Sequence, residues 1–382
     1  MYLTECLPSD WREARLLGRV MTADGPSPVL ARGGRLYDLS RHVATTAQAA
    51  AMDDLDHAGV DLGPLDALTA ASAWAPDAGD LTLLSPLDLQ CVKASGVTFA
   101  VSALERVIEE RARGDADAAN AVRRSILDRI GGELTDLRPG SDAAEAVKAQ
   151  LIAEGLWSQY LEVAIGPYAE IFTKAPVLAS VGWGAEVGVR ADSAWNNPEP
   201  EVVIVCDPAG RPVGAALGND VNLRDIEGRS ALLLGKAKDN NASASVGPFI
   251  RLFDDGFGMD DVRSATVRLE VEGDDGFVMT GESSMSLISR DPEELVRQTL
   301  SAHQYPDGFA LYLGTMFAPI DDRDAPGKGF THRIGDRVRV SSERLGVLEN
   351  RVATCDQAPP WRFGVLELMR NLAGRGLLGA AT

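Results

Sequence analysis

The chain has 382 residues, of which 45% are apolar and 24% charged, a composition typical of a globular protein with a substantial core. Its formal net charge of −19 disfavours a nucleic-acid partner and an anionic membrane surface, because both attract lysine and arginine. No apolar run approaches the roughly 20 residues of a transmembrane helix, and the four scattered cysteines match neither a zinc cluster nor a disulfide framework. We therefore expect a reduced, cytoplasmic protein.

The chain divides into two predicted regions. Residues 1–164 combine helices with short strands, such as those expected between residues 15 and 34. From residue 165 the pattern changes to alternating strands and turns rich in glycine and proline, which predicts a mostly β domain over residues 165–382. The expected fold class is therefore α+β.

Helices are predicted in the second half of the first region. Ser102 and Glu105 have the spacing of a capping box, which would begin a helix at Ser102. A second helix is expected over about residues 118–129. A third would follow Gly140-Ser141 and reach about residue 160.

The second region begins with a predicted hairpin. Residues 201–205 and 211–215 read as strands, and residues 207–210, Asp-Pro-Ala-Gly, read as the turn between them. Residues 265–271 alternate polar and apolar side chains, as a half-buried strand does. Asp291 followed by a proline predicts the start of a helix.

Three carboxylates are expected on one face of this hairpin. Glu199 and Glu201 are two residues apart in a strand, so their side chains point the same way. A four-residue loop places Glu199 opposite Gly218 and Glu201 opposite Ala216. Asp220 has the parity of Gly218 and therefore joins the same face.

Such a cluster of like charges is costly unless a cation neutralises it. Mg²⁺ suits the three oxygen donors and keeps water sites for a substrate, and Mn²⁺ is the alternative. The competing interpretation is a solvated strand face, with Asp220 capping a helix. A loop of another length without a bulge would also turn Asp220 away.

The residues around Asp220 carry a resemblance to a known family. Residues 218–227, Gly-Asn-Asp-Val-Asn-Leu-Arg-Asp-Ile-Glu, resemble the Asp-x-x-x-Arg-Asp-hydrophobic-Gln/Glu signature of the fumarylacetoacetate hydrolase family. Glu-x-Glu one hairpin earlier and Gly314-Thr315 later match further elements of that family. The resemblance implies a β-roll C-terminal domain with a Mg²⁺ site, beside a smaller mixed N-terminal region.

Other stretches resemble the sugar-acid dehydratases of the family. These are Glu-Ile-Phe-Thr-Lys at 170–174, Trp-Asn-Asn-Pro-Glu-Pro-Glu at 195–201, and His-Gln-Tyr-Pro-Asp-Gly-Phe at 303–309. The likeness implies a metal-dependent hydro-lyase that converts a 2-keto-3-deoxy-pentonate, such as 2-keto-3-deoxy-D-xylonate, to 2,5-dioxopentanoate in pentose catabolism. It also implies a homo-oligomer, a dimer or a tetramer.

One departure from the family bears on the reaction. Many of its hydrolases carry a histidine and a glutamate that activate water, and Ser102 stands here where that histidine would be. This favours dehydration over the alternatives, which are C–C hydrolysis or decarboxylation of an acylpyruvate. A non-catalytic protein that binds a sugar acid is a third interpretation.

The resemblance also assigns roles to single residues. Lys238 would stabilise the developing enolate, although Lys236 remains an alternative, and Glu170 would be the acid/base. Substrate contacts are expected from four residues: Phe172, Arg224, Lys238 and Thr315. The metal ligands would be Glu199, Glu201 and Asp220.

Overall fold

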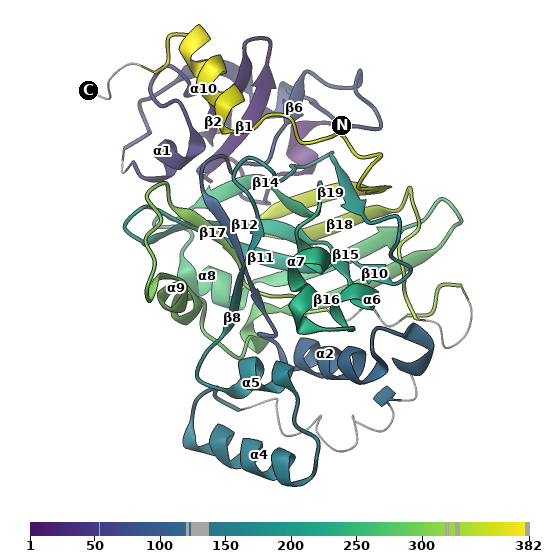
Figure 1. The fold of residues 1–382 in the computed structure, drawn as a ribbon. Coiled ribbons are helices and arrows are strands. Elements are labelled where there is room, and N and C mark those ends of the chain that lie inside the picture. Colours follow the sequence, from purple (N-terminus) through teal and green to yellow (C-terminus); the bar gives the residue numbers. More distant parts are fainter. Residues whose placement is uncertain are drawn as a thin grey trace.

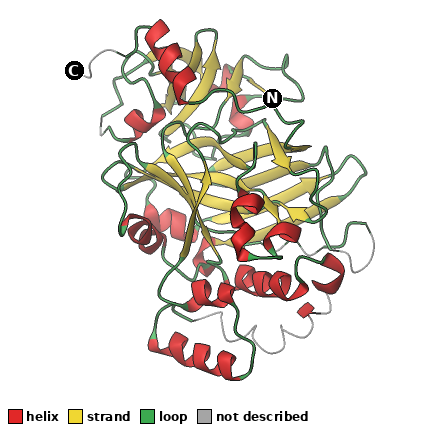
Figure 2. Ribbon diagram, in the orientation of Figure 1, coloured by secondary structure: helices red, strands yellow, loops and turns green. Residues whose placement is uncertain are grey.

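The computed structural model describes residues 1–52, 54–119, 122–123, 137–317, 319, 321–324 and 329–378. Within these ranges both helices and strands are abundant, and the predicted α+β class is confirmed (Figures 1 and 2). No helix in the described part of the chain is long and apolar enough to cross a membrane.

The strands are β1 (Leu16–Thr22), β2 (Gly25–Arg32), β3 (Arg35–Asp38), β4 (Val60–Pro64), β5 (Ala70–Ala71), β6 (Leu81–Leu83), β7 (Cys91–Gly96), β8 (Glu170–Ala175), β9 (Glu186–Val189), β10 (Asn196–Asn197), β11 (Pro200–Cys206), β12 (Pro212–Asp220), β13 (Asn222–Leu223), β14 (Ala244–Leu252), β15 (Thr266–Glu272), β16 (Val278–Ser284), β17 (Phe309–Tyr312), β18 (Arg337–Ser342) and β19 (Gly346–Thr354).

The α-helices are α1 (Thr46–Ala50), α2 (Ala100–Ala112), α4 (Asp142–Ala153), α5 (Gln159–Ile165), α6 (Arg224–Glu227), α7 (Leu234–Lys238), α8 (Met259–Ser264), α9 (Pro292–Leu300) and α10 (Val365–Gly374). Short 3-10 helices lie at Leu3–Glu5, Leu65–Ala67, Ala231–Leu233 and Met285–Leu287.

Two sheets form the centre of the molecule. The described residues give a twelve-stranded sheet in the order β4-β3-β2-β1-β14-β12-β11-β17-β7-β8, in which β6 also pairs with β1 and β5. A five-stranded sheet has the order β16-β15-β18-β19-β9, and β10 pairs with β13. The larger sheet combines the N-terminal strands β1 to β4 with strands as far along the chain as β17, so its centre depends on pairings between distant segments.

The core lies between the two sheets because their strands alternate side chains across the pleat. Val202 and Ile204 of β11 belong to the same buried cluster as Val267 and Leu269 of β15. The other face of β11, with Val203, belongs to a second cluster on the far side of the large sheet. The central strand β11 is therefore buried on both faces.

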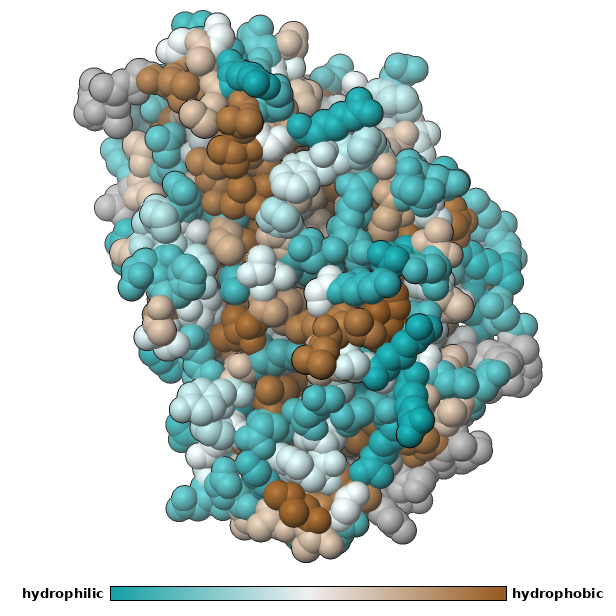
Figure 3. Space-filling model, in the orientation of Figure 1, coloured by the Kyte–Doolittle hydropathy of each residue, from teal (hydrophilic) through white to brown (hydrophobic). Residues whose placement is uncertain are grey.

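The helices α1 and α10 lie at one end of the molecule and α2, α4 and α5 at the other, while α6 and α7 lie in front of the strands (Figures 1 and 2). At one end α2 and α5 share a third apolar cluster with part of α4. At the other end α10 packs Leu368 and Leu372 against the protein but leaves Leu366 67% and Met369 51% exposed. Apolar side chains accordingly gather around α10 on the face shown in Figure 3.

Several predicted elements are confirmed. The hairpin within residues 15–34 is β1 paired with β2, and the strand expected over residues 265–271 is β15. The Asp291 side chain caps α9 as expected. The Ser141 side chain caps α4, but this helix ends at Ala153 and not near residue 160, and α5 begins separately after Ser158. The helix expected over about residues 118–129 falls largely outside the described residues.

The capping box predicted for Ser102 and Glu105 is wrong. The helix α2 begins earlier, with Phe99 as its N-cap, and Ser102 occupies the third helical position. The Ser102 hydroxyl donates to the Phe99 carbonyl oxygen at 2.8 Å and accepts the Phe99 N–H at 3.3 Å. The serine therefore reaches back to the cap instead of being the cap.

The predicted boundary between residues 164 and 165 stays a prediction. Across it, β7 pairs with β8 antiparallel and with β17 parallel. Similarly, β1 pairs with β14. Hydrogen bonds of the large sheet thus connect the two predicted regions.

A close contact within the large sheet provides a test of its packing. A Cβ added at Gly18 of β1 would lie 2.3 Å from the Phe249 ring, which is buried. We expect Gly18→Ala to lower the free energy of unfolding by about 1–3 kcal/mol in urea titrations, because the ring must move. Gly374→Ala in α10 meets nothing within 4 Å and is the matched control. Equal stability of Gly18→Ala and the wild type would contradict this packing.

Candidate metal centre and active site

Neighbouring strands position the three predicted metal ligands. Glu201 of β11 pairs with Gly218 of β12, and the Asp220 N–H donates to the Glu199 carbonyl oxygen at 2.9 Å. The predicted register, with Glu199 opposite Gly218, is therefore wrong by two residues. The loop between Cys206 and Pro212 has five residues in place of the predicted four, and a bulge at the end of β11 adds the second residue of the shift. Because side chains alternate with a period of two, the shift leaves all three carboxylates on one face.

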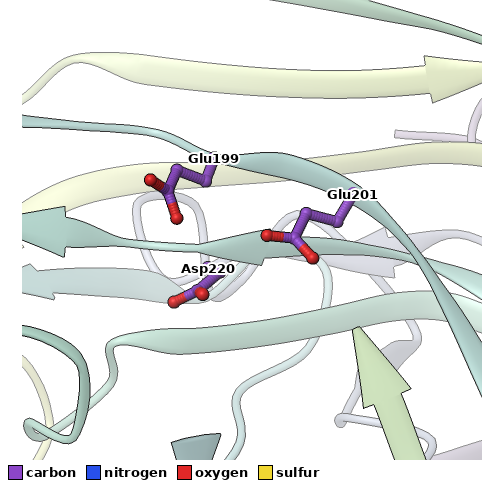
Figure 4. A group of neighbouring side chains, drawn as sticks. All are labelled: Glu199, Glu201 and Asp220. Atoms are coloured by element: carbon purple, nitrogen blue, oxygen red, sulfur yellow. The ribbon is translucent and has the colours of Figure 1, made fainter. Parts of the chain in front are cut away.

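The three carboxylates converge on one small space (Figure 4). One oxygen from each residue can be chosen so that all lie within 4.8 Å of one another. Glu199 is 3%, Glu201 1% and Asp220 2% exposed. Three buried oxygen donors at this spacing fit a hard divalent cation such as Mg²⁺ or Mn²⁺.

Glu201 shows the electrostatic cost of this arrangement. Burial, followed by the negative charges of Asp220 and Glu199, raises its pKa well above the ordinary value of a glutamate. Its carboxylate accepts the Gly314 N–H at 2.6 Å, and it makes no ion pair within the described ranges. A cation between the three carboxylates would remove this cost.

Two buried lysines contact Asp220. The Lys174 ammonium lies 2.7 Å from Oδ1, and the Lys238 ammonium lies 3.1 Å from Oδ2. Burial alone acts to raise the pKa of Asp220, but the two ammonium groups outweigh it and lower the pKa. Asp220 therefore stays charged more readily than Glu201.

The structure distinguishes the two candidate lysines by position. Lys238 is buried in α7 and donates to Glu199 as well as to Asp220, whereas Lys236 is exposed. Burial acts to lower the pKa of Lys238, but the surrounding carboxylates, Asp220 first, raise it. Lys238 is thus held as an ammonium group, which donates hydrogen bonds and does not act as a base.

These groups line a narrow cavity with about 20 Å³ of free volume, enough for one water-sized occupant. A substrate of several carbon atoms therefore requires side chains to move. The lining residues are Ser95, Gly96, Val97, Ser102, Arg106, Glu170, Phe172, Glu199, Glu201, Asp220, Glu227, Lys238 and Thr315.

A buried arginine lies among these carboxylates. The Arg106 guanidinium is 2.5 Å from Glu109, 2.6 Å from Glu199 and 2.9 Å from Glu227. Burial raises the pKa of Glu227 to about 7, although Arg106 opposes the increase. Arg106 therefore connects a predicted metal ligand to a second carboxylate that can hold a proton near neutral pH.

Glu170 also lines the cavity, as its predicted role requires. It pairs with Gly96 across β7 and β8, and a Cβ on Gly96 would lie 1.9 Å from a Glu170 oxygen. Only glycine permits this approach. Burial raises the pKa of Glu170, with the opposing charge of Arg106 second in size.

The other predicted substrate contacts differ in position. Phe172 and Thr315 line the cavity, but Arg224 does not. The Arg224 guanidinium lies 2.8 Å from Glu109, donates to the Pro319 carbonyl oxygen at 3.1 Å and packs over Trp195 at 5.2 Å. Among the described residues, Arg224 is connected to the cavity through Glu109, which also pairs with Arg106.

Three residues of the site were missed by the sequence reasoning. Glu227 and Lys174 stand in the stretches that carry the family resemblance, so the signal existed without an assigned role. Arg106 belongs to no motif. Its place in the site depends on how α2 packs against the ends of β11 and β12, which the sequence pattern does not specify.

Sequence comparison finds two related dehydratases, although no protein-family model matches the chain. A protein of Haloferax volcanii named probable 2-keto-3-deoxyxylonate dehydratase is 28% identical over 267 residues, which cover 64% of this chain and 89% of that protein. The 2-dehydro-3-deoxy-D-arabinonate dehydratase of Saccharolobus solfataricus is 30% identical over 179 residues, 47% of this chain and 57% of that protein.

Solved structures share the fold. A 2-keto-3-deoxy-D-arabinonate dehydratase in its apo form has a TM-score of 0.62 at 20% identity, covering 89% of this chain and 99% of that chain. The structure described as complexed with magnesium and 2,5-dioxopentanoate gives the same values. A 2-hydroxyhepta-2,4-diene-1,7-dioate isomerase from Mycobacterium marinum has a TM-score of 0.53 at 19% identity, covering 90% and 99%.

The expected resemblance is confirmed by both comparisons. The relatives in sequence are named as dehydratases, which are hydro-lyases, and the similar structures include dehydratases and isomerases. The chain is therefore a homologue of the sugar-acid dehydratases and has the fumarylacetoacetate-hydrolase-like fold.

Proposed function

We propose that the protein is a metal-dependent dehydratase that converts a 2-keto-3-deoxy-pentonate, such as 2-keto-3-deoxy-D-xylonate, to 2,5-dioxopentanoate in pentose catabolism. The observation that carries the proposal is the buried carboxylate triad with an ammonium group beside it. The names of the two related proteins support the substrate class.

The cation would be held by Glu199, Glu201 and Asp220. Mg²⁺ fits these donors, and Mn²⁺ is the alternative. When bound, such a cation supplies a Lewis acid for the oxygen atoms of the 2-keto acid. Glu201 supports the proposal most directly, because its raised pKa shows that a negative charge at this position is unfavourable unless a cation neutralises it.

The side chains around the triad would carry out the proton transfer, stabilise the developing charge and orient the substrate. Lys238, held as an ammonium group, donates to the C2 oxygen while negative charge develops there. Glu170, whose pKa is raised by burial, exchanges the proton at C3. Phe172 and Thr315 line the cavity and orient the substrate, and Arg224 keeps Glu109 in position from behind.

The reaction balances without a further reactant. The proton from C3 and the hydroxyl from C4 leave together as water, and a C3–C4 double bond forms. Loss of a proton from C5 and return of one to C3 moves this double bond to C4–C5. The resulting enol becomes the aldehyde when its hydroxyl proton is lost and C4 is protonated.

Ser102 supports dehydration over hydrolysis. It lines the cavity at the position where hydrolases of the family carry their histidine, and its hydroxyl is engaged with the Phe99 backbone. A serine in this arrangement does not take a proton from water. Because Ser102 disfavours hydrolysis, acylpyruvate hydrolysis or decarboxylation ranks second among the candidate functions. Binding of a sugar acid without turnover ranks third.

We also propose a cytoplasmic homo-oligomer, a dimer or a tetramer. The four cysteines are free, as is usual in a reducing compartment. The exposed apolar face of α10, with Leu366 and Met369, is of a kind that contacts between subunits cover.

The reaction is tested by incubating the protein with 2-keto-3-deoxy-D-xylonate and Mg²⁺. We expect a semialdehyde, measured through a coupled aldehyde dehydrogenase, and at least about a hundredfold loss of rate with a chelator. Restored activity on adding Mg²⁺ back is the control. Pyruvate as the product would favour C–C cleavage, and binding without turnover would favour the third candidate.

Glu201→Gln should abolish tight metal binding and reduce activity by a factor of about a hundred or more, because it removes one of three charged donors. Mn²⁺ titration followed by electron paramagnetic resonance measures the binding. Without metal and at neutral pH, the same substitution should raise the free energy of unfolding by on the order of 1 kcal/mol, because a carboxyl whose pKa is raised on folding destabilises the folded state at any pH above its unfolded pKa. The exposed Glu343→Gln is the control. Unchanged Mn²⁺ affinity in Glu201→Gln would exclude this site.

Lys238→Met should lower kcat by roughly 10²–10³-fold, because it removes a donor aimed at the developing charge. Mn²⁺ binding should persist. Lys236→Met, which removes an equal charge from an exposed position two residues away, should retain activity. Loss of activity in Lys236→Met but not in Lys238→Met would show that Lys236 is the active lysine.

A further inference from the structure

A second cavity lies away from the active site and shares no lining residue with it. It has about 330 Å³ of free volume, near the lower limit for small-molecule sites. Arg19 of β1, Leu83 of β6 and the segment 180–185 contribute to its walls, together with Phe363, which precedes α10.

The walls combine apolar and polar groups. Leu83 and Phe363 are apolar, and the Trp183 ring is buried. Hydroxyl groups are supplied by Ser72, Ser85 and Ser180, of which the last two form a 2.8 Å hydrogen bond with each other. Such a lining, mainly apolar with a few polar groups, is typical of small-molecule sites.

Arg19 is the unusual member of this lining. It is 7% exposed, and its guanidinium donates to the Leu87 carbonyl oxygen at 3.0 Å. Within the part of the chain that the structure describes, Arg19 has no other side-chain hydrogen bond and no ion pair. Buried arginines are ordinarily paired with a carboxylate, because an uncompensated buried charge is costly.

The nearby carboxylate of Asp88 is already engaged. Its oxygens accept the N–H groups of Thr46 at 2.6 Å, Ala47 at 3.0 Å and Leu89 at 2.7 Å. Asp88 therefore accepts hydrogen bonds from the N-terminus of α1. The Arg19 guanidinium lies beyond ion-pair distance of the Asp88 carboxylate. The guanidinium keeps donors for an anion that enters the cavity.

We propose that this cavity binds a small monocarboxylate with an apolar body. The guanidinium matches the planar, two-oxygen geometry of a carboxylate, and the apolar walls match a short aliphatic or aromatic chain. A sugar acid fits poorly, because its hydroxyl groups would face apolar walls and lose their hydrogen bonds to water. The ligand class thus differs from the substrate of the proposed reaction.

The cavity wall is connected to the active site through β14. Val181 accepts the Val246 N–H and donates to the Ala244 carbonyl oxygen, at 2.9 Å each. Ala244 in turn pairs with Asp220 in the neighbouring strand. A ligand in the second cavity therefore contacts a segment bonded to the strand beside the proposed metal ligands.

Hexanoate is a suitable probe, and hexan-1-ol is its uncharged counterpart. Ligand-observed nuclear magnetic resonance with the full chain should show hexanoate binding at millimolar concentration or below. Arg19→Met should weaken hexanoate binding about 10–100-fold and leave hexan-1-ol binding unchanged, since only the charge-assisted hydrogen bonds are lost. Arg41→Met, at an exposed arginine outside the cavity, removes the same charge and should bind hexanoate like the wild type.

Two controls exclude hexanoate binding at the metal centre. The titration is carried out in the presence of a chelator, and it is repeated with Glu201→Gln, which should bind hexanoate like the wild type. Ala73→Trp, at an exposed position on the cavity wall, should block both probes and serves if Arg19→Met does not fold. The proposal is overturned if the wild type does not bind hexanoate. It is also overturned if Arg19→Met and Ala73→Trp both bind hexanoate as tightly as the wild type does. It is also overturned if Ala73→Trp dissociates an oligomer in sedimentation, because a second copy of the chain then covers the cavity.

Discussion

Buried negative charge at the ends of β11 and β12 is the constraint on which the active site depends. In the part of the chain that the structure describes, five carboxylates line one narrow cavity: Glu170, Glu199, Glu201, Asp220 and Glu227. The side-chain cations that line it with them are Arg106 and Lys238, and Lys174 contacts Asp220 from behind. The positive charge is less than the negative charge, so the site favours a divalent cation and holds some of its carboxyl groups protonated without one.

The surrounding elements keep this charge together. The strand β11 is buried on both faces, so the proposed ligands stand on a rigid support. Arg106 brings α2 to the cavity, and Arg224 holds Glu109 behind it. Replacing one of these arginines by a neutral residue would leave a buried carboxylate without its partner. The free-energy cost of that unpaired charge exceeds the net stability that the ion pair contributes.

The sequence predicted the face of the carboxylate triad although it predicted the wrong register. A shift of two residues returns every side chain to its own side, whereas a shift of one would have dispersed the group. The family resemblance favours Lys238 over Lys236, and the burial of Lys238 agrees with that choice.

Other parts of the site lay beyond the sequence pattern. The start of α2 was misplaced because Ser102 has the cap spacing, while the actual cap is Phe99, whose side chain makes no cap hydrogen bond. Arg106 was missed because tertiary packing, and no local motif, brings it to Glu199. Long-range ion pairs of this kind leave no periodic signal in one sequence.

The order of strands in the large sheet has a consequence for folding. The hairpin β11–β12 closes over a short loop, whereas β7 must find β17, more than two hundred residues away, and α2 comes from the N-terminal side. Local contacts form before distant ones because closing a long loop costs more entropy. The nascent hairpin would therefore gather Glu199, Glu201 and Asp220 before Arg106 arrives. A dissolved divalent cation would then accelerate the assembly of the protein as well as serve its chemistry.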